Sequence, residues 1–240
     1  PWNANFSSKD GMLFDAECKA LLCVPGGAEK VSIPTSVTRI VNRAMEGCVS
    51  LTSVTIPDSV SSIGARAFHE CESLQSVSIP ASVTNIGEEA FWCCRKLATV
   101  TIPPSVSSID DRMFRGCSSL RSIIIPSSVK QIGVLAFDYC RSLTTVEVPS
   151  SVTNISYGAF IDCNNLTTVV IPSSVINIGR SAFKGAGLKE VYVDRDDEIR
   201  VSDMLTKSGV VVSNLSFKAV DSKIAKDSAE KIMKPLKNLW

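Results

Sequence analysis

The feature that most constrains this chain is a repeat of 23 residues, visible in three separate columns. Proline recurs at that spacing, at Pro34, Pro57, Pro80, Pro103, Pro126, Pro149 and Pro172. Cysteine recurs with the same step, at Cys48, Cys71, Cys94, Cys117, Cys140 and Cys163. A large apolar column keeps the same phase, at Met45, Phe68, Phe91, Phe114, Phe137, Phe160 and Phe183. Columns in one phase predict a solenoid, in which a single repeat buries too little surface to fold alone and stacking supplies the rest.

One repeat unit, residues 75–97, shows how each position is used; it reads QSVSIPASVTNIGEEAFWCCRKL. Val77 and Ile79 alternate with polar neighbours, which predicts a short strand with one buried face. The proline that follows ends the strand, because it cannot donate to a ladder. The spacing of Phe91 and Cys94 predicts a short helical turn that points both side chains inward.

The pattern LxxVxIPxSVxxIGxxAFxxCxxL, carried by residues 29–193, closely resembles the BspA-like leucine-rich-repeat family of bacterial and protist surface proteins. The resemblance implies an α/β repeat fold: a right-handed leucine-rich-repeat solenoid of seven repeats. Its short strands would form a parallel concave sheet, with short helical turns on the convex side. It also implies a non-enzymatic adhesion or protein-binding module, at the cell surface or secreted. Its partners would be extracellular-matrix proteins, host cells or other microbes. The alternative is a structural spacer or scaffold domain with no strong ligand of its own.

Residues 1–28 lack the repeat columns and are expected to form an N-terminal cap. Met12–Phe14 and Leu21–Val24 are apolar segments on either side of a polar turn, which predicts a hairpin covering the first repeat. The first repeat itself departs from the pattern at Ala44-Met45, as terminal repeats commonly do.

Residues 194–220 are expected to cap the other end. The sequence predicts a helix over 194–207 with Ile199, Met204 and Leu205 facing the array, followed by extended segments at 210–212 and 215–217. Residues 221–240 carry five lysines on a weakly amphipathic pattern and are expected to be a polar helical tail or linker.

The charge balance of the chain excludes a strong global field. There are 25 Lys and Arg residues against 24 Asp and Glu, a net charge of +1, so nothing favours nucleic acid or an anionic membrane as a partner. No apolar run approaches the roughly 18 residues of a membrane span, so no membrane insertion is expected in this segment. A protein partner and a monomeric state are expected. The chain opens with Pro1 and no secretory signal pattern, which indicates a processed or excised segment.

The nine cysteines invite metal or disulfide chemistry, but their spacing argues against it. Zinc ligands come in local pairs, whereas column members 23 residues apart would stack with parallel Cβ vectors. We therefore expect buried thiols that fill the core, with no metal and no cofactor. Cys18 and Cys23 could pair in the cap, and we expect that they do not. Cys93, beside Trp92, is expected to point outward as the one reactive thiol.

His69, the single histidine, offers the only imidazole for catalysis. We expect it to be an exposed surface residue, since a general base also needs a nucleophile and an orienting acid close by. The chain has no phosphate-binding glycine loop, no HExxH and no GxSxG. The sequence therefore predicts no enzymatic activity.

The candidate contact surface consists of the strand residues that point away from the core. In the N-terminal half of the predicted sheet these are almost all Ser and Thr, which β-propensity and hydroxyl ladders explain without a ligand. Farther along they include apolar, acidic and aromatic groups, which are more informative on an exposed sheet. We hypothesise that the contact surface is the C-terminal half: Ser122, Ile124, Thr145, Glu147, Thr168, Val170, Glu190 and Tyr192. Arg95, Lys96, Arg121 and Arg141 could form a basic rim along one edge. A merely solvated sheet is the alternative.

Overall fold

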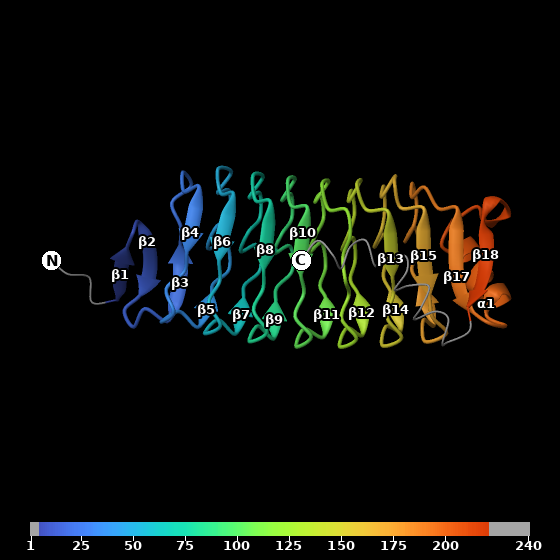
Figure 1. Cartoon of the computed structure of the whole chain (residues 1–240), viewed down its shortest axis with the longest axis horizontal. Helices are drawn as coiled ribbons and strands as arrows, with labels where there is room; N and C mark the ends of the chain where they lie inside the picture. The colour runs from blue at the N-terminus through green and yellow to red at the C-terminus, as the bar shows by residue number, and fades with distance from the viewer. Residues whose placement is uncertain (1–4, 221–240) are drawn as a thin grey trace.

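The computed structural model describes residues 5–220, so the helical tail or linker expected over 221–240 lies outside the described residues. The described chain winds into a stack of coils, each one repeat long, arranged along a single long axis (Figure 1). Each coil runs through a first strand, a tight turn, a second strand of two residues, and a longer turn segment back to the next first strand.

The first strands of successive coils lie side by side and carry the predicted alternation. In β6 the pattern is exposed, buried, exposed, because Val54 points into the core between Ser53 and Thr55. The strands of this row are β4 (Lys30–Ser32), β6 (Ser53–Thr55), β8 (Ser76–Ser78), β10 (Thr99–Thr101), β13 (Thr145–Glu147), β15 (Thr168–Ile171) and β17 (Glu190–Asp194). Apart from β10 and β13, which do not pair, neighbours in the row pair in parallel, and most pairs join residues 23 positions apart, as in Val31 with Val54. The predicted parallel sheet is therefore confirmed.

A second row of strands was not predicted. Ile63 and its equivalents in the other coils each end a two-residue parallel strand. The row consists of β5 (Arg39–Ile40), β7 (Ser62–Ile63), β9 (Asn85–Ile86), β11 (Ser108–Ile109), β12 (Gln131–Ile132), β14 (Asn154–Ile155) and β16 (Asn177–Ile178). Two residues are too few to show an alternating pattern, so these strands could not be predicted from hydrophobic periodicity.

The turn segments are not helical, contrary to the expectation of short helical turns. Two columns in each segment adopt positive φ, and the second includes the non-glycine residues Glu70 and Cys93 at 58° and 59°. The N–H groups of Arg66, Phe68 and Glu70 donate to carbonyls of the following coil rather than four residues back. An α-helix allows neither feature, because its residues all have negative φ and its bonds stay within the segment. The turn segments thus form a third hydrogen-bonded side of the stack.

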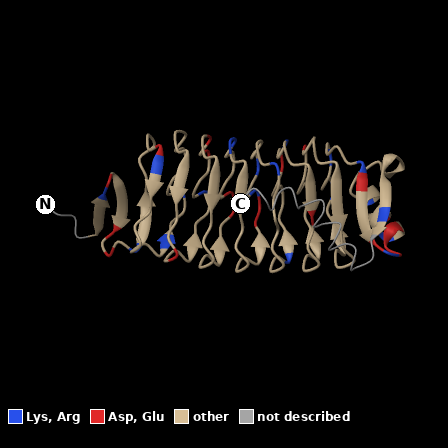
Figure 2. Ribbon diagram, in the orientation of Figure 1, with Lys and Arg blue, Asp and Glu red and all other residues tan. Residues whose placement is uncertain are grey.

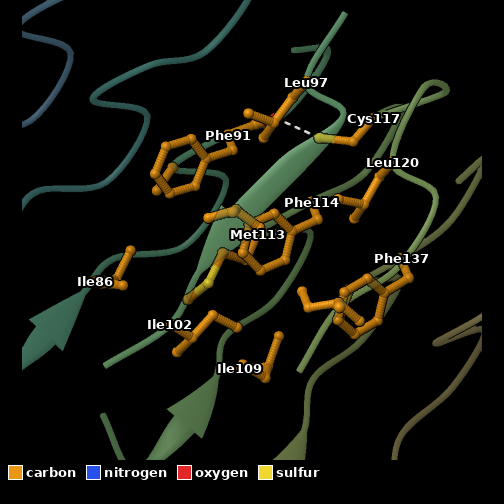
Figure 3. Packing of buried hydrophobic residues seen from close by; sticks show 14 of the residues in the cluster. Ile86, Phe91, Leu97, Ile102, Ile109, Met113, Phe114, Cys117, Leu120 and Phe137 are labelled. Atoms are coloured by element: carbon orange, nitrogen blue, oxygen red, sulfur yellow. Dashed lines mark hydrogen bonds between the residues drawn. The ribbon is translucent and has the colours of Figure 1, made fainter. Parts of the chain in front are cut away.

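The core is one continuous apolar cluster that runs the length of the solenoid. The phenylalanine column from Phe68 to Phe183 stacks ring on ring, with centroids 5.1–5.5 Å apart and rings within 10° of parallel. Phe114 and its neighbours in this column are shown in Figure 3. Residues one repeat apart therefore occupy the same environment, as the repeat predicts.

Both rows of strands are interrupted near the middle of the molecule. In the second row β9 and β11 belong to separate sheets, and in the first row residues 121–126 form no strand between β10 and β13. The turn segments bridge the gap, since the Phe91 N–H donates to the Met113 carbonyl and the Phe114 N–H to the Ala136 carbonyl. The two breaks fall at different coils, and each is spanned by the other row: β8 pairs with β10 beside the first break, and β12 pairs with β11 and β14 beside the second.

At the N-terminal end, β2 (Met12–Asp15) pairs antiparallel with β3 (Ala20–Cys23) and with an additional strand, β1 (Phe6–Lys9). β3 then pairs in parallel with β5, so this end continues the second row.

At the other end α1 (Glu198–Lys207) buries Val201 and Leu205. Ile199 was expected to face the array but is 79% exposed. A 3-10 turn (Val212–Asn214) begins at the last residue of the first segment expected to be extended, 210–212, and β18 (Ser216–Val220) pairs in parallel with β17.

Candidate functional site

The outward side chains of β13, β15, β17 and β18 form a single four-stranded surface, which we call the C-terminal face. Register places its side chains in two rows across the strands. One row contains Thr145, Thr168, Glu190 and Ser216, and the other contains Glu147, Val170, Tyr192 and Lys218. Neighbouring strands lie about 4.8 Å apart, so each row presents four side chains over about 15 Å. Six of the eight predicted contact residues are brought together in this way.

The remaining two predicted residues, Ser122 and Ile124, lie in the stretch without a strand. Ile124 is 48% exposed, so the expectation of an exposed apolar residue holds although the expected strand is missing. These two residues lie within the interruption of the first-strand row, one coil before the C-terminal face begins at β13.

Lys218 is the member of the face that sequence reasoning missed. Its ammonium donates to Glu190 and, at 3.3 Å, to the Tyr192 hydroxyl, and it lies 5.3 Å from the centre of the Tyr192 ring. The Tyr192 hydroxyl donates to Glu190 at 3.2 Å. The hydrogen bond from Lys218 lowers the pKa of Glu190, and the same bond raises the pKa of Lys218. Lys218 lies outside the 23-residue period, but the alternation Ser216-Phe217-Lys218 was a signal that could have placed it on this face.

The turn segments carry a line of contacts across five consecutive coils. The Glu46 carboxylate contacts His69 Nδ1 at 2.8 Å, and the His69 ring lies 4.8 Å from that of Trp92. The Arg115 guanidinium lies over the Trp92 ring at 5.1 Å and pairs with Asp138 through Nε at 2.9 Å. This line holds neighbouring coils together through side chains.

Two expectations about reactive groups in the turn segments are corrected by these contacts. His69 is not an exposed surface residue: its side chain is only 12% exposed, because Trp92 covers it and Glu46 binds it. Cys93 is partly covered rather than pointing freely outward, and burial raises the pKa of its thiol. A raised pKa leaves less of the reactive thiolate at neutral pH.

The cysteine column has a role beyond filling space. Each thiol from Cys71 to Cys163 donates to the carbonyl oxygen of the Met or Phe in the preceding coil, as Cys117 does to Phe91 at 3.2 Å (Figure 3). Burial raises the pKa of these thiols well above its usual value. Cys18 and Cys23 are not bonded to each other, and the Cys18 thiol lies 2.9 Å from the Ser7 hydroxyl.

Charged groups of both signs are scattered along the solenoid in the view of Figure 2. Over residues 5–220, no cluster of three or more His, Cys, Asp or Glu side chains could hold a metal ion. In the same part of the chain, no helix is both long and apolar enough to cross a membrane.

Comparison with known proteins agrees with this geometry. A leucine-rich-repeat protein from Eubacterium ventriosum superposes with a TM-score of 0.73 at 25% identity, over 78% of this chain and 51% of that protein, so this chain spans about half of its length. The leucine-rich-repeat protein of T. pallidum superposes with a TM-score of 0.67 at 28% identity, over 85% of this chain and 91% of that protein. The pneumococcal vaccine antigen PcpA, at 17% identity and a TM-score of 0.54 over 91% of this chain and 48% of its own, shares the fold.

Among curated proteins none matches the chain. A family model described as "BspA type Leucine rich repeat region (6 copies)" matches residues 27–144 and 84–201, which together cover most of the chain. This chain belongs to the BspA-type leucine-rich-repeat family.

Proposed function

We propose that this chain is a non-enzymatic protein-binding module and that its C-terminal face is the contact surface. Leucine-rich-repeat proteins generally mediate protein interactions, and the matching family is not a catalytic one. The observation that carries the proposal is the row Glu147, Val170, Tyr192 and Lys218, which sets an acid, an apolar group, an aromatic ring and a base side by side on paired strands. Aromatic anchors among charged groups are typical of protein interfaces.

The backbone of this face is well suited to binding without rearrangement. The outward side chains stand on paired strands whose inward partners, Val146, Val169 and Val191, are fully buried. The Tyr192 side chain is fixed further by Glu190 and Lys218. Side chains that are already ordered lose less entropy on binding, which favours affinity.

The proposal extends to features that follow from the family resemblance. We propose that the coils wind in the right-handed sense expected for parallel strand connections, and that the first-strand row lies on the concave side. Residues 1–28 and 194–220 serve as the caps of the seven repeats over 29–193. The module acts as a monomer at the cell surface or in secreted form, on extracellular-matrix proteins or the surfaces of other cells, as an adhesin.

The test is a triple substitution, Ile124→Ser with Val170→Ser and Tyr192→Ser, assayed for binding to purified extracellular-matrix proteins and intact cells. Loss of two apolar groups and one aromatic anchor should weaken binding at least tenfold. The matched control is Thr55→Ala with Ser78→Ala and Thr101→Ala on β6, β8 and β10, which should leave binding unchanged.

Circular dichroism and thermal unfolding confirm that each variant is folded. Unchanged binding by the folded C-terminal variant would reject this surface. If the unmodified chain bound none of these partners, the spacer role would be favoured instead.

A further inference from the structure

The turn side of the solenoid contains a hollow of about 430 Å³, separate from the C-terminal face. It exists because one coil carries smaller residues than its two neighbours at two positions. In one column Gly116 lies between Cys93 and Tyr139. In a second column, two residues farther on, Ser118 lies between two arginines. Gly116 and Ser118 therefore form the floor, and the walls are two coils, or about 10 Å, apart.

Three arginines line the hollow, and two of them are held by aromatic rings. The Arg115 guanidinium lies 5.1 Å from the Trp92 ring centre, and that of Arg141 lies 5.1 Å from the Tyr139 ring centre. Stacking fixes the plane of a guanidinium and leaves its N–H donors available at the edge. Arg141 forms no ion pair with any residue in the part of the chain that the structure describes.

Two acidic residues, Asp138 and Glu72, pair with arginines of the hollow but are not among the residues that line it. Asp138, which is 2% exposed, pairs with Arg115 at 2.9 Å and fixes its position. Glu72 pairs with Arg95 at 3.1 Å, but both side chains are well exposed, so this pair is weak and easily exchanged. No carboxylate is among the residues that line the hollow.

We propose that this hollow binds a short acidic peptide segment, with one or two carboxylates on the arginines and an apolar or aromatic side chain against the exposed side chain of Tyr139. Arginine forks match carboxylates in bidentate geometry, and the flanking rings suit an apolar neighbour. A long polyanion fits less well, because the column of Cys93, Gly116 and Tyr139 continues into Glu70 at one end and Asp162 at the other. A chain of anionic groups laid along the solenoid would meet like charges on both sides.

The probe is a five-residue peptide, Gly-Glu-Tyr-Glu-Gly with blocked ends, titrated into the full chain by calorimetry and followed at the Trp92 indole N–H by NMR. Arg141→Gln should weaken binding about tenfold or more, since it removes one charge-assisted contact. Ser118→Arg should abolish binding although it adds positive charge, because the new side chain fills the hollow. Arg180→Gln, an exposed arginine outside the hollow, removes the same charge and should change nothing.

The comparison ligands are the same peptide with Gln in place of Glu, inorganic phosphate, and a heparin oligosaccharide, and all three should bind at least tenfold more weakly. If Ser118→Arg bound the peptide more tightly than the unmodified chain does, the proposal would be overturned. Positive charge alone, and not the shape of the hollow, would then account for binding. Preferential binding of heparin or phosphate would overturn the choice of an acidic peptide. The double variant Val170→Ser with Tyr192→Ser should leave peptide binding intact. A negative result for the hollow therefore does not count against the C-terminal face as a contact surface, and the reverse also holds.

Discussion

The cysteine column has two roles in the stack: its side chains fill the core, and its thiols bind buried carbonyl groups. The Cys117 side chain is small enough for the core, and its thiol satisfies a Phe91 carbonyl that lies away from water. A buried thiol of this kind stays protonated in the folded chain, because burial raises its pKa far above the usual value. In the unfolded chain the same thiol ionises above pH of about 8.5.

The consequence is that alkaline pH should destabilise the fold. A folded pKa above the unfolded one gives stability that is complete below the unfolded value and is lost as pH rises beyond it. The free energy of unfolding should therefore fall by about 1.4 kcal/mol per pH unit for each such thiol above pH of about 9. Urea unfolding at several pH values between 8.5 and 10, in the presence of a reductant, measures this slope.

Cys117→Ala isolates one thiol. It should lower the free energy of unfolding at pH 7 by about 1–2 kcal/mol through the lost packing and hydrogen bond. It should also make the alkaline slope shallower by about 1.4 kcal/mol per pH unit. Thr55→Ala, which removes no thiol, is the control and should leave the slope unchanged. An unaltered slope in Cys117→Ala would contradict the assignment.

At the scale of the element, the break between β9 and β11 has a local origin. In the column that follows the second strand, Gly64, Gly87 and Gly133 donate to the coil before them, whereas Asp110 forms no such bond to Ile86. Side-chain size alone does not explain this, since Ser156 in the same column keeps its bond to Ile132 at 2.9 Å.

Charge is the feature that distinguishes Asp110. Glu88, Asp110 and Asp111 line one hollow of about 280 Å³ at the boundary between the two coils. We infer that repulsion among their carboxylates holds the two strands apart.

Asp110→Ser should close this break. The residue 110 N–H would then donate to the Ile86 carbonyl, and its hydrogen exchange should slow at least tenfold, as for Ser156. Asp110→Asn keeps the size and removes only the charge, so it should slow the exchange as well. If only the serine variant slowed exchange, size and not charge would be the cause.

The elements also show where sequence reasoning succeeds and where it stops. The alternation of apolar and polar residues around Val77 and its equivalents predicted the first-strand row, because such alternation indicates a strand with one buried face. Phe91 and Cys94 were correctly placed inward, but their spacing fits a tight turn as well as a helix, so the helical prediction failed. Glycine at 47, 116 and 185 was the overlooked signal, since it shares the positive-φ column with Glu70 and Cys93.

The candidate face was predictable in part for the same reason. Val170 and Tyr192 follow from the repeat, whereas Lys218 joins the face from β18, which the period does not reach. The ionic and hydrogen-bonded contacts of Tyr192 depend on that strand and could not be read from any one repeat.

At the scale of the whole molecule, each coil is stabilised by the coils on either side of it. A terminal coil has only one such neighbour, so we expect the stack to unfold most easily at its ends. The last coil is covered by α1, whose Val201 and Leu205 are fully buried. Leu205→Ala should lower the free energy of unfolding of the terminal coils by about 2–5 kcal/mol. Ile199→Ala, in the same helix but exposed, is the matched control and should have little effect.

Hydrogen exchange along the chain distinguishes a cap from an ordinary packed helix. In Leu205→Ala, protection should fall most in β16 and β17 and least in β4 and β6. A uniform loss over all coils would show that the stack unfolds as one unit, contrary to the nearest-neighbour view.

The parallel phenylalanine rings also determine how a chain of this kind can change in length. Because each ring stacks on an equivalent ring 5.1–5.5 Å away, duplication of one complete 23-residue unit would lengthen the rod by one ring spacing. Every side chain would still stack on the equivalent side chain of the neighbouring coil. A change of any other size must be absorbed by a turn between two stacked positions, as it is in the 22-residue step from Val169 to Val191. Whole units are thus the natural step by which the rod grows or shortens, while the residues on its outside are free to diverge.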